Sequence, residues 1–525
     1  MARPHVRRLR TRSAAVATGI LVTGLLAAPA SAQEETPGGA SGTVARTVGD
    51  ARYEPGACPK TPEPVPELEG ARCGTLTVPE NRTEPGGRTI KLGVAIVPAA
   101  AVDPKPDPIV WLAGGPGDNA VWAAKRAVDG GLNRDRDVIL MSQRGTYSAD
   151  PALTCRNIDE FDARAVGLVW DAPSTGREHV DATKACREKL AGSGADLTAY
   201  NDIQSSADLA DLRTTLGLEE WNVFGISYGT DLALTYMRLH PEGIRSVGID
   251  GILPPSKAGL AATWRSARQG FDGVFKACAE QPACNKRYPN LSATFDRLVR
   301  ELEAEPVTTT VTLPGSQTPV KVILDGGALV NWMASATHVA PGIPRSLDEL
   351  AHGNPQRVAE QWVGAKTDPH NFGHISHGLA YGVFCSEWMP YETDAQVLRA
   401  GREAFPAFPS SVLAQAPQLP FLREDCDEAW NIPAAPRSVR DVTRSDIPTL
   451  VVSGGFDSQT GADNGPYVAR TLSRATVVTI PYVPHGAIVY SKCAQAVTVS
   501  FFDTATAPNT ACVKDFKPPQ FEIAP

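Results

Sequence analysis

The sequence predicts an α/β fold: a mostly parallel sheet flanked by helices, with a mainly helical cap inserted into it. Short apolar runs typical of buried strands alternate with segments of helical periodicity, and this rhythm favours parallel pairing. The rhythm stops after about residue 255 and returns after about residue 438, and helical segments rich in Trp, Ala and Arg lie between. We therefore expect a core of residues 58–255 and 438–525, with a cap of residues 256–437.

The core strands can be followed in order along the chain. Residues 74–78 and 89–97 have the alternating or continuously apolar pattern of early antiparallel strands. Further strands are expected at residues 108–113, 137–141, 221–224, 246–249, 448–453 and 475–480. In the cap, only residues 307–324 have a strand pattern. Because functional residues of parallel sheets lie at the carboxyl ends of strands, the loops after these strands are where a site is expected.

The most informative segment is Gly225-Ile226-Ser227-Tyr228-Gly229, which follows a short apolar strand and precedes a helix. This strand, sharp turn and helix lift the serine out of the sheet, and the two glycines supply the small volume that the bend needs. A serine hydroxyl is a weak nucleophile until a base activates it. For the motif alone, a glycine-rich turn without catalysis is the alternative.

A suitable acid and base follow in the last part of the chain. Asp457 comes after the strand at residues 448–453, and His485 comes after the next strand. An imidazole can accept the serine proton, and a carboxylate can hold that imidazole through Nδ1. Asp250, which also follows a strand, is the rival acid. The order Ser227, Asp457, His485 is that of the α/β-hydrolases.

Gly114-Gly115-Pro116-Gly117 follows the third core strand and predicts an oxyanion hole. The backbone N–H groups of Gly115 and Tyr228 are the expected donors, with Gly114 as the alternative within the loop. Such donors act on the charge that develops in the transition state, and losing one typically costs about 3 kcal/mol. A plain Gly-Pro turn is the other interpretation.

With these motifs together, the chain resembles the secreted tripeptidyl aminopeptidases of the proline-iminopeptidase family of serine peptidases. The resemblance extends from about Cys58 to Cys512. The motifs that carry it are Gly114-Gly-Pro-Gly117, Gln143-Arg144-Gly145, Asp208-Leu209 with Arg213, Gly225-Ile-Ser227-Tyr-Gly229, Asp250-Gly251 with Pro254-Pro255, Asp457-x-x-Thr460 and His485-Gly486. The resemblance implies an α/β-hydrolase that releases tripeptides from free N-termini without a cofactor.

The resemblance also implies acidic groups in the cap that bind the substrate's ammonium group. Glu387, in Cys385-Ser386-Glu387, is the candidate, and a solvated surface glutamate is the alternative. Two other functions compete with the peptidase interpretation. A carboxylesterase or lipase would use the same triad, because acyl transfer to serine cleaves both kinds of bond. A binding protein would keep the fold without catalysis.

The first 32 residues have the three parts of an export signal: five arginines, an apolar stretch over about residues 14–28, and Ala30-Ser31-Ala32. We expect cleavage after Ala32, a flexible leader over residues 33–57, and a secreted, extracellular protein. The apolar stretch is too short for a stable membrane anchor. Arg7-Arg8 leaves twin-arginine export as an alternative to the general route.

The charge of the chain disfavours nucleic acid as a partner. The signal carries five of the 50 basic residues and no acidic residue, so a formal net charge of −8 becomes −13 in the mature chain. Phosphate contacts require an excess of Lys and Arg. We expect a monomer that binds peptides with free N-termini.

Ten cysteines, all beyond the signal, fit disulfides formed in an oxidising compartment. The simplest pairing joins nearest neighbours: 58–73, 155–186, 278–284, 385–426 and 493–512. A zinc site is the weaker alternative, because no Cys-x2-Cys pair occurs. His370, His374 and His377 have a spacing that could suggest a metal-binding helix face, but no carboxylate is suitably spaced. We expect them to be loop or cap histidines, and we expect no metal.

Overall fold

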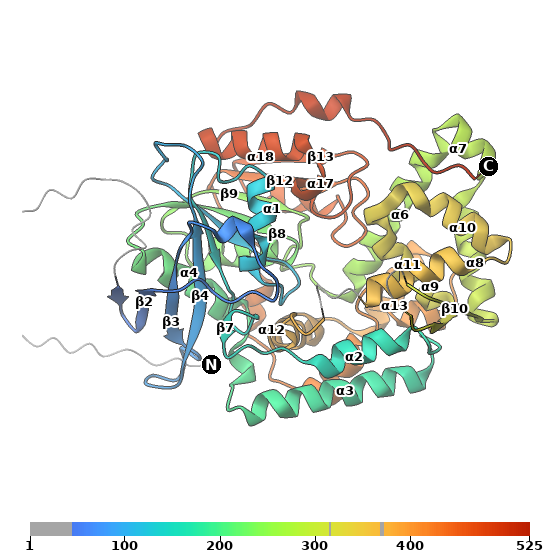
Figure 1. Cartoon of the computed structure of the whole chain (residues 1–525), viewed down its shortest axis with the longest axis horizontal. Helices are drawn as coiled ribbons and strands as arrows, with labels where there is room; N and C mark the ends of the chain where they lie inside the picture. The colour runs from blue at the N-terminus through green and yellow to red at the C-terminus, as the bar shows by residue number, and fades with distance from the viewer. Residues whose placement is uncertain (1–44, 314–316, 368–371, 525) are drawn as a thin grey trace, which may run out of the picture. The chain divides into compact units, whose positions relative to one another are not determined.

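A computed structural model describes residues 45–313, 317–367 and 372–524 (Figure 1). The predicted signal, its cleavage point after Ala32 and the first part of the leader lie outside these ranges. Within these ranges, none of the helices combines the length and the apolar character needed to cross a bilayer.

A single large sheet forms the centre of the core, in the order β1-β2-β3-β4-β6-β5-β8-β9-β12-β13, with β7 paired to β4. The strands are β1 (Arg46–Val48), β2 (Ala51–Pro55), β3 (Arg72–Pro79), β4 (Thr89–Val97), β5 (Ile109–Leu112), β6 (Val138–Met141), β7 (Ala149–Asp150), β8 (Trp221–Ile226), β9 (Ile244–Asp250), β12 (Thr449–Gly454) and β13 (Ala475–Ile480). Pairing is antiparallel from β1 to β4 and between β4 and β6. From β6 through β5 to β13 it is parallel.

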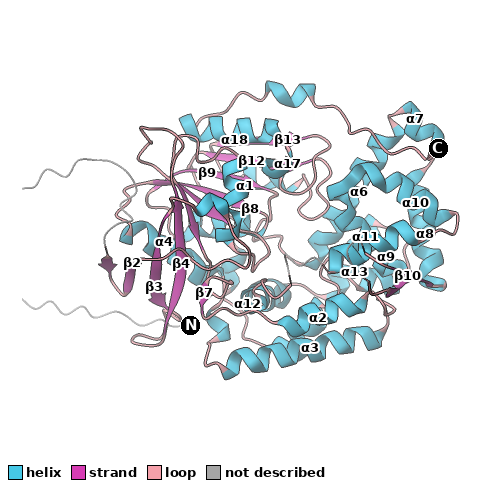
Figure 2. Ribbon diagram, in the orientation of Figure 1, coloured by secondary structure: helices cyan, strands magenta, loops and turns pink. Residues whose placement is uncertain are grey.

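Helices pack on both faces of this sheet (Figure 2), because the inner strands are apolar on both sides. In β5, Val110 and Leu112 join one hydrophobic core, whereas Ile109 and Trp111 join the other. The first core includes α4 (Asp202–Thr215), α5 (Tyr228–Leu239) and α16 (Asn464–Ala469); the second includes α1 (Ala124–Asp129), α17 (Ala487–Tyr490) and α18 (Lys492–Thr504).

The segment between β9 and β12 is mainly helical and forms the cap. Its helices are α6 (Leu260–Ala279), α7 (Pro282–Arg287), α8 (Leu291–Ala304), α9 (Gly326–Ala336), α10 (Ile343–Ala351), α11 (Gln356–Lys366), α12 (His377–Val383), α13 (Asp394–Ala404), α14 (Ser410–Ala414) and α15 (Leu422–Glu424). Its only described strands are the antiparallel pair β10 (Val307–Val311) and β11 (Val320–Leu324), which fall where the strand pattern predicts them.

Two helices that precede Ser227 in the sequence also pack with the cap. Figure 1 shows α2 (Arg156–Ala165) and α3 (Pro173–Gly192) beside the cap helices. In α3, His179 bonds to Asp425 at 3.0 Å, and the Arg187 side chain donates to the carbonyl of Trp430 at 2.7 Å. The sequence interpretation places these helices in the core, but their contacts are with the cap.

Each disulfide joins nearest neighbours in the sequence. The pairs are Cys58–Cys73, Cys155–Cys186, Cys278–Cys284, Cys385–Cys426 and Cys493–Cys512. The closed loops span 6 to 41 residues, and such crosslinks typically stabilise a fold by about 2–4 kcal/mol each. This many disulfides fits an oxidising environment outside the cytoplasm.

Candidate active site

Ser227 occupies a strained turn between β8 and α5. Its φ and ψ are 57° and −129°, a conformation that non-glycine residues rarely adopt. A Cβ on Gly225 would lie 2.3 Å from the carbonyl oxygen of Gly229, and a Cβ on Gly229 would lie 2.2 Å from that of Leu112. The turn therefore requires both glycines of the pentapeptide for steric reasons, and it exposes the serine at its apex.

Gly229→Ala should consequently destabilise the protein by about 3 kcal/mol or more, because the new methyl group overlaps backbone that cannot move independently. Urea unfolding of the purified protein measures the loss. Gly364→Ala is the matched control, since Gly364 lies in helix α11 with no atom within 4 Å of an added Cβ. That variant should be as stable as the wild type or slightly more stable. Equal stability of the two variants would contradict the steric argument.

The sheet register brings the three predicted catalytic loops to one edge. Ile226 pairs with Asp250 at the ends of β8 and β9, and Gly454 pairs with Ile480 at the ends of β12 and β13. Because these strands are parallel, the residues that follow them emerge side by side. The loops that carry Ser227, Asp457 and His485 are therefore neighbours despite their separation in the sequence.

Asp457 holds the imidazole of His485. The Nδ1–H group of His485 donates to Asp457 Oδ2 at 2.9 Å, and the Thr460 hydroxyl donates to the same oxygen at 2.7 Å. The other carboxylate oxygen accepts the backbone N–H groups of Gln459 and Thr460 at 2.9 and 2.8 Å. The carboxylate is the acceptor in all of these hydrogen bonds. Nδ1 of His485 therefore carries the ring proton, and Nε2 is the basic nitrogen.

Burial and the neighbouring charges have opposite effects on the pKa values of Asp457 and His485. Burial raises the pKa of Asp457, but the charge and hydrogen bond of His485, with the Thr460 contacts, lower it to about 2. Burial lowers the pKa of His485, but the charge and hydrogen bond of Asp457, and the charge of Asp250, raise it above its usual value. Asp457 is therefore ionised across the neutral range and stabilises an imidazolium beside it.

His485 lies against the residues that flank Ser227. A Cβ on Gly251 would lie 2.8 Å from Cε1 of the ring, and the N–H of Ser227 donates to the carbonyl of Asp250 at 2.9 Å. A Cβ on Gly486 would lie 3.0 Å from Cδ1 of Ile226. Within the described residues, the buried Nε2 has no hydrogen-bond partner, and the Ser227 hydroxyl is not bonded to it. Catalytic hydrogen bonds often align only when substrate binds.

Asp250, the rival acid, contacts a different part of the histidine loop. Its two carboxylate oxygens accept the N–H groups of Ala487 and Ile488 at 3.0 and 2.7 Å. Burial raises its pKa to about 6, against the lowering effect of these N–H groups. Asp250 therefore anchors the start of α17 after His485, whereas Asp457 is the one of the two acids that bonds to the ring.

The glycine loop after β5 passes directly beside the serine. A Cβ on Gly114 would lie 2.9 Å from Cβ of Ser227 and 3.4 Å from its Oγ. Gly115 has a φ of 105° and, with Ser227, lines a cavity of about 330 Å³. Tyr228 is the first residue of α5, so its N–H has no intrahelical acceptor. The loop and the helix start thus place both predicted donors next to the serine.

The cavity at Ser227 lies between the core and the cap. Thr460 belongs to its core wall, and Phe384 and Trp388 belong to its cap wall. A second cavity of about 160 Å³ shares Phe384, Gln418 and Leu419 with the first. It continues into the cap, where its lining includes the carboxylates of Asp162 and Asp425. The same lining includes His179, which bonds to Asp425, and Lys366, whose Nζ lies 3.9 Å from Oδ1 of Asp162. An elongated substrate could therefore extend from the serine into a polar end within the cap.

Glu387 does not fit its predicted role as the ammonium-binding group. It is buried, and its carboxylate accepts the N–H of Asp202 at 3.0 Å. Burial, and then the charges of Asp202 and Asp231, raise its pKa well above the usual range, which disfavours the ionised form that an ammonium group would need. Among the described residues, Glu387 belongs to neither cavity lining, although Phe384 and Trp388 in the same π-helical turn (Phe384–Trp388) do.

Glu387 instead belongs to a buried polar network behind the serine that sequence reasoning missed. The hydroxyl of Tyr228 donates to Asp202, whose pKa is raised to about 6 by burial. Burial and the charge of Asp202 likewise raise the pKa of Asp231 well above its usual range. The network fixes the Tyr228 side chain and, with it, the first turn of α5. Short polar residues spread over three helices give no local signal of such a cluster.

Of the three clustered histidines, His374 and His377 are described by the structure, and His370 lies outside the described residues. His374 packs edge-on against Trp122 and Tyr147, and His377 lies 3.6 Å from Asp159. Burial lowers the pKa of His377 to about 4. In the described ranges, no group of three or more potential metal ligands is present.

Two family models match the chain. Residues 107–306 match the α/β hydrolase fold, and residues 419–513 match the model of TAP-like protein. These matches confirm the predicted fold class, and they include both segments that carry Ser227, Asp457 and His485. The second match covers the segment that carries Asp457 and His485.

The chain is also similar to several curated bacterial proteins. Serine protease Hip1 of Mycobacterium tuberculosis is 27% identical over 228 residues, or 41% of this chain and 43% of that protein. Carboxylesterase B of the same species is 26% identical over 293 residues, or 53% and 55% of the two chains. Tripeptidyl aminopeptidase of Streptomyces coelicolor is 27% identical over 220 residues, or 39% of each chain. The matches thus span about half or less of these relatives.

All three relatives are named as hydrolases. The sheet topology agrees with the α/β hydrolase fold of the first family model. Together these findings show that the chain has the α/β-hydrolase fold and that its residues 419–513 match the model of TAP-like protein.

Proposed function

We propose that the chain is a serine exopeptidase that releases short peptides, tripeptides above all, from free N-termini. Ser227 attacks the scissile carbonyl carbon, and Nε2 of His485 accepts the hydroxyl proton. The same proton then passes to the leaving amine, which departs as the C–N bond breaks and leaves an acyl-serine. Water, deprotonated by His485, hydrolyses that ester and restores the serine. The observation that carries this proposal is the Asp457–His485 pair beside the strained turn of Ser227.

The backbone N–H groups of Gly115 and Tyr228 hold the oxyanion in this proposal. Both residues adjoin Ser227, one through the glycine loop and one through the start of α5. Fixed N–H donors stabilise the tetrahedral intermediate without reorganising, because their direction is set by the fold. No cofactor is required for any step.

The two connected cavities support the exopeptidase part of the proposal. Three extended residues span roughly 10 Å, and a free N-terminus brings one positive charge to the far end. The carboxylates of Asp162 and Asp425 lie in the second cavity, which adjoins the serine cavity through Phe384 and Gln418. Asp425 is already bonded to His179 and to the Tyr381 hydroxyl. We therefore assign the binding of the ammonium group to Asp162, whose Oδ1 lies 3.9 Å from Nζ of Lys366, in place of Glu387. The similarity to tripeptidyl aminopeptidase of S. coelicolor supports the same length of product.

A substrate panel tests the proposal. The purified mature protein should hydrolyse an Ala-Pro-Ala arylamide with a free N-terminus much faster than the acetylated form, because acetylation removes the charge that Asp162 would bind. Asp162→Asn should raise KM for the free peptide more than for the acetylated one. Equal rates for both peptides would refute the aminopeptidase assignment.

A carboxylesterase is the second candidate, supported by the similarity to Carboxylesterase B of M. tuberculosis. Short acyl esters in the same panel distinguish it. An esterase would show a kcat/KM for the esters that far exceeds that for any peptide, with no dependence on a free amine.

The pH dependence of kcat/KM should have its acidic midpoint above pH 6.5. His485 must be neutral to accept the serine proton, and its pKa is raised above the usual value of about 6.5 by Asp457. Activity is therefore lost as the pH falls through this raised pKa. A stopped assay between pH 5 and 9 measures the midpoint, and a value clearly below 6.5 would contradict the role of Asp457.

We also propose that the protein is exported, with cleavage after Ala32, and works outside the cytoplasm. The five disulfides support an oxidising location. N-terminal sequencing of protein recovered from culture medium tests the cleavage point, and a mature chain that begins at residue 33 is the expected result.

A further inference from the structure

A large open groove lies on the opposite side of helix α6 from the serine cavity. Its volume is about 660 Å³, twice that of the serine cavity. Three segments form its walls: the start of α6 with the loop before it, helix α13 with the turn before it, and residues 437–441. Ala261 and Arg265 of α6 line this groove, whereas Ala262 and Thr263 line the serine cavity.

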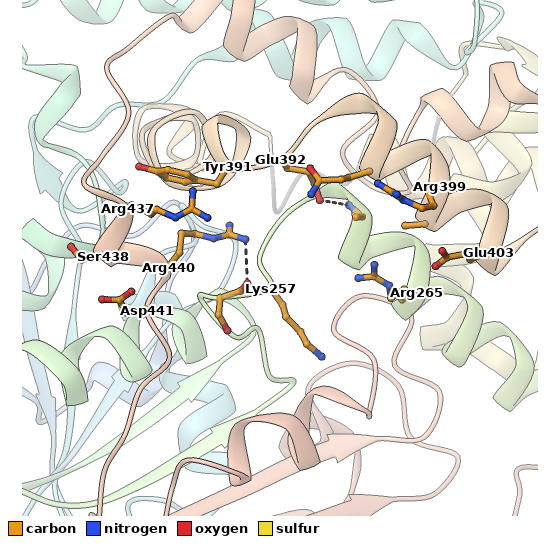
Figure 3. Close-up of a pocket in the computed structure, with 14 residues that line it drawn as sticks. Lys257, Arg265, Tyr391, Glu392, Arg399, Glu403, Arg437, Ser438, Arg440 and Asp441 are labelled. Atoms are coloured by element: carbon orange, nitrogen blue, oxygen red, sulfur yellow. Dashed lines mark hydrogen bonds between the residues drawn. The ribbon is translucent and has the colours of Figure 1, made fainter.

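Basic side chains from all three walls converge on the groove. They are Lys257, Arg265, Arg399, Arg437 and Arg440. Figure 3 shows Arg437 and Arg440 on one side of the pocket, Arg265 and Arg399 on the other, and Lys257 between them. The acidic residues of the lining are Glu392, Glu403 and Asp441, so the groove carries an excess of two positive charges in a chain whose net charge is −8.

The acids of the lining balance only part of the positive charge of these five side chains. Among the described residues, none of the five forms an ion pair with a carboxylate. Arg440 donates to the carbonyl oxygens of Ser256 and Ala258, which orient the guanidinium without cancelling its charge. The carboxylate of Glu392, the most buried acid of the lining, accepts hydrogen bonds from the N–H groups of Leu260 and Ala261 at 2.7 and 3.0 Å.

Burial and neighbouring positive charges destabilise the charged forms of two basic residues in the groove, Lys257 and Arg440. Burial lowers the pKa of Lys257, and the charges of Arg265 and Arg470 lower it further. Burial also lowers the pKa of Arg440, more than the surrounding acids raise it, and Arg437 adds to the lowering. An anion between these groups would offset their mutual repulsion, and a guanidinium fork binds phosphate and carboxylate oxygens with two parallel hydrogen bonds.

We propose that this groove is a binding site for a small polyanion with phosphate or carboxylate groups. Basic groups lie on each of the three walls, an arrangement that fits a ligand with at least two anionic groups. The volume exceeds that of a single phosphate and leaves room for such a ligand. The site is separate from the serine and does not depend on the peptidase assignment.

Isothermal titration calorimetry of the mature protein with inorganic pyrophosphate and, separately, with citrate tests the site. The wild type should bind at least one of them, and added NaCl should weaken the binding because salt screens the contacts. Arg265→Gln with Arg399→Gln should weaken it by at least about tenfold. Both arginines are exposed, so the double variant should fold, and a thermal melt checks this.

Arg402→Gln is the matched control, because Arg402 is an exposed arginine of the same helix α13 outside the groove lining. Its affinity should equal that of the wild type. Binding of pyrophosphate alone would identify a phosphate site, and binding of citrate alone a polycarboxylate site. No binding of either compound, or equal weakening by Arg402→Gln, would overturn the proposal. The measurement involves no turnover, so its failure would leave the peptidase assignment untouched.

Discussion

Ser227→Ala is expected to lower kcat by roughly 10⁵–10⁶-fold, because no other group in the proposed mechanism can form the acyl intermediate. The fold should be unaffected. Among the residues that the structure describes, the Ser227 hydroxyl donates no hydrogen bond, and the contacts of the turn use its backbone. The free energy of unfolding should therefore change by less than about 0.5 kcal/mol. Steady-state assays with the free arylamide and thermal melts of both proteins measure the two effects.

Ser335→Ala is the control for this variant, since Ser335 lines the same cavity but its hydroxyl donates to the carbonyl of Asn331. It should retain most of the activity. A fluorophosphonate probe adds a second readout, because it should label the wild type and Ser335→Ala but not Ser227→Ala. Full activity of Ser227→Ala would remove the serine from the mechanism, and an unlabelled wild type would favour a non-catalytic binding protein.

The catalytic elements could be predicted from the sequence because their determinants are local. A strand that runs into Gly-x-Ser-x-Gly leaves few backbone paths, because a side chain at Gly225 or Gly229 would overlap the neighbouring backbone. The acid and base follow directly from the ends of β12 and β13, so the parallel topology alone places them at the same edge as Ser227. Short apolar strands are sufficient to predict this arrangement.

The composition of the cap and the position of Glu387 could not be predicted, because both depend on tertiary packing. Helices α2 and α3 precede Ser227 in the sequence, and their amphipathic pattern does not specify whether the sheet or the cap covers them. The motif around Glu387 shows an acid beside a cysteine, but its direction is set by the N–H of Asp202, 185 residues away. The basic groove could not be predicted either, because its five basic residues come from three separate segments.

Asp457→Asn should reduce kcat by about 10⁴-fold, because it would stabilise the wrong tautomer of His485. Asp457 Oδ1 accepts two backbone N–H groups, from Gln459 and Thr460, and only an oxygen can do so. The asparagine amide nitrogen must then take the place of Oδ2, which faces Nδ1 of the ring. That nitrogen donates to Nδ1, so the ring proton moves to Nε2, and Nε2 can no longer accept the proton of Ser227.

Asp250→Asn separates this tautomer effect from a general loss of charge near the ring. Asp250 also raises the pKa of His485, but its carboxylate accepts N–H groups of α17 and makes no bond to the imidazole. The activity of Asp250→Asn should fall far less than that of Asp457→Asn. Its thermal stability should also be lower, because its contacts with α17 are weakened. In Asp457→Asn the acidic midpoint of kcat/KM should also move to lower pH, because the main group that raises the pKa of His485 is gone. If Asp250→Asn instead lost as much activity as Asp457→Asn, without destabilisation, Asp250 would be the acid of the triad.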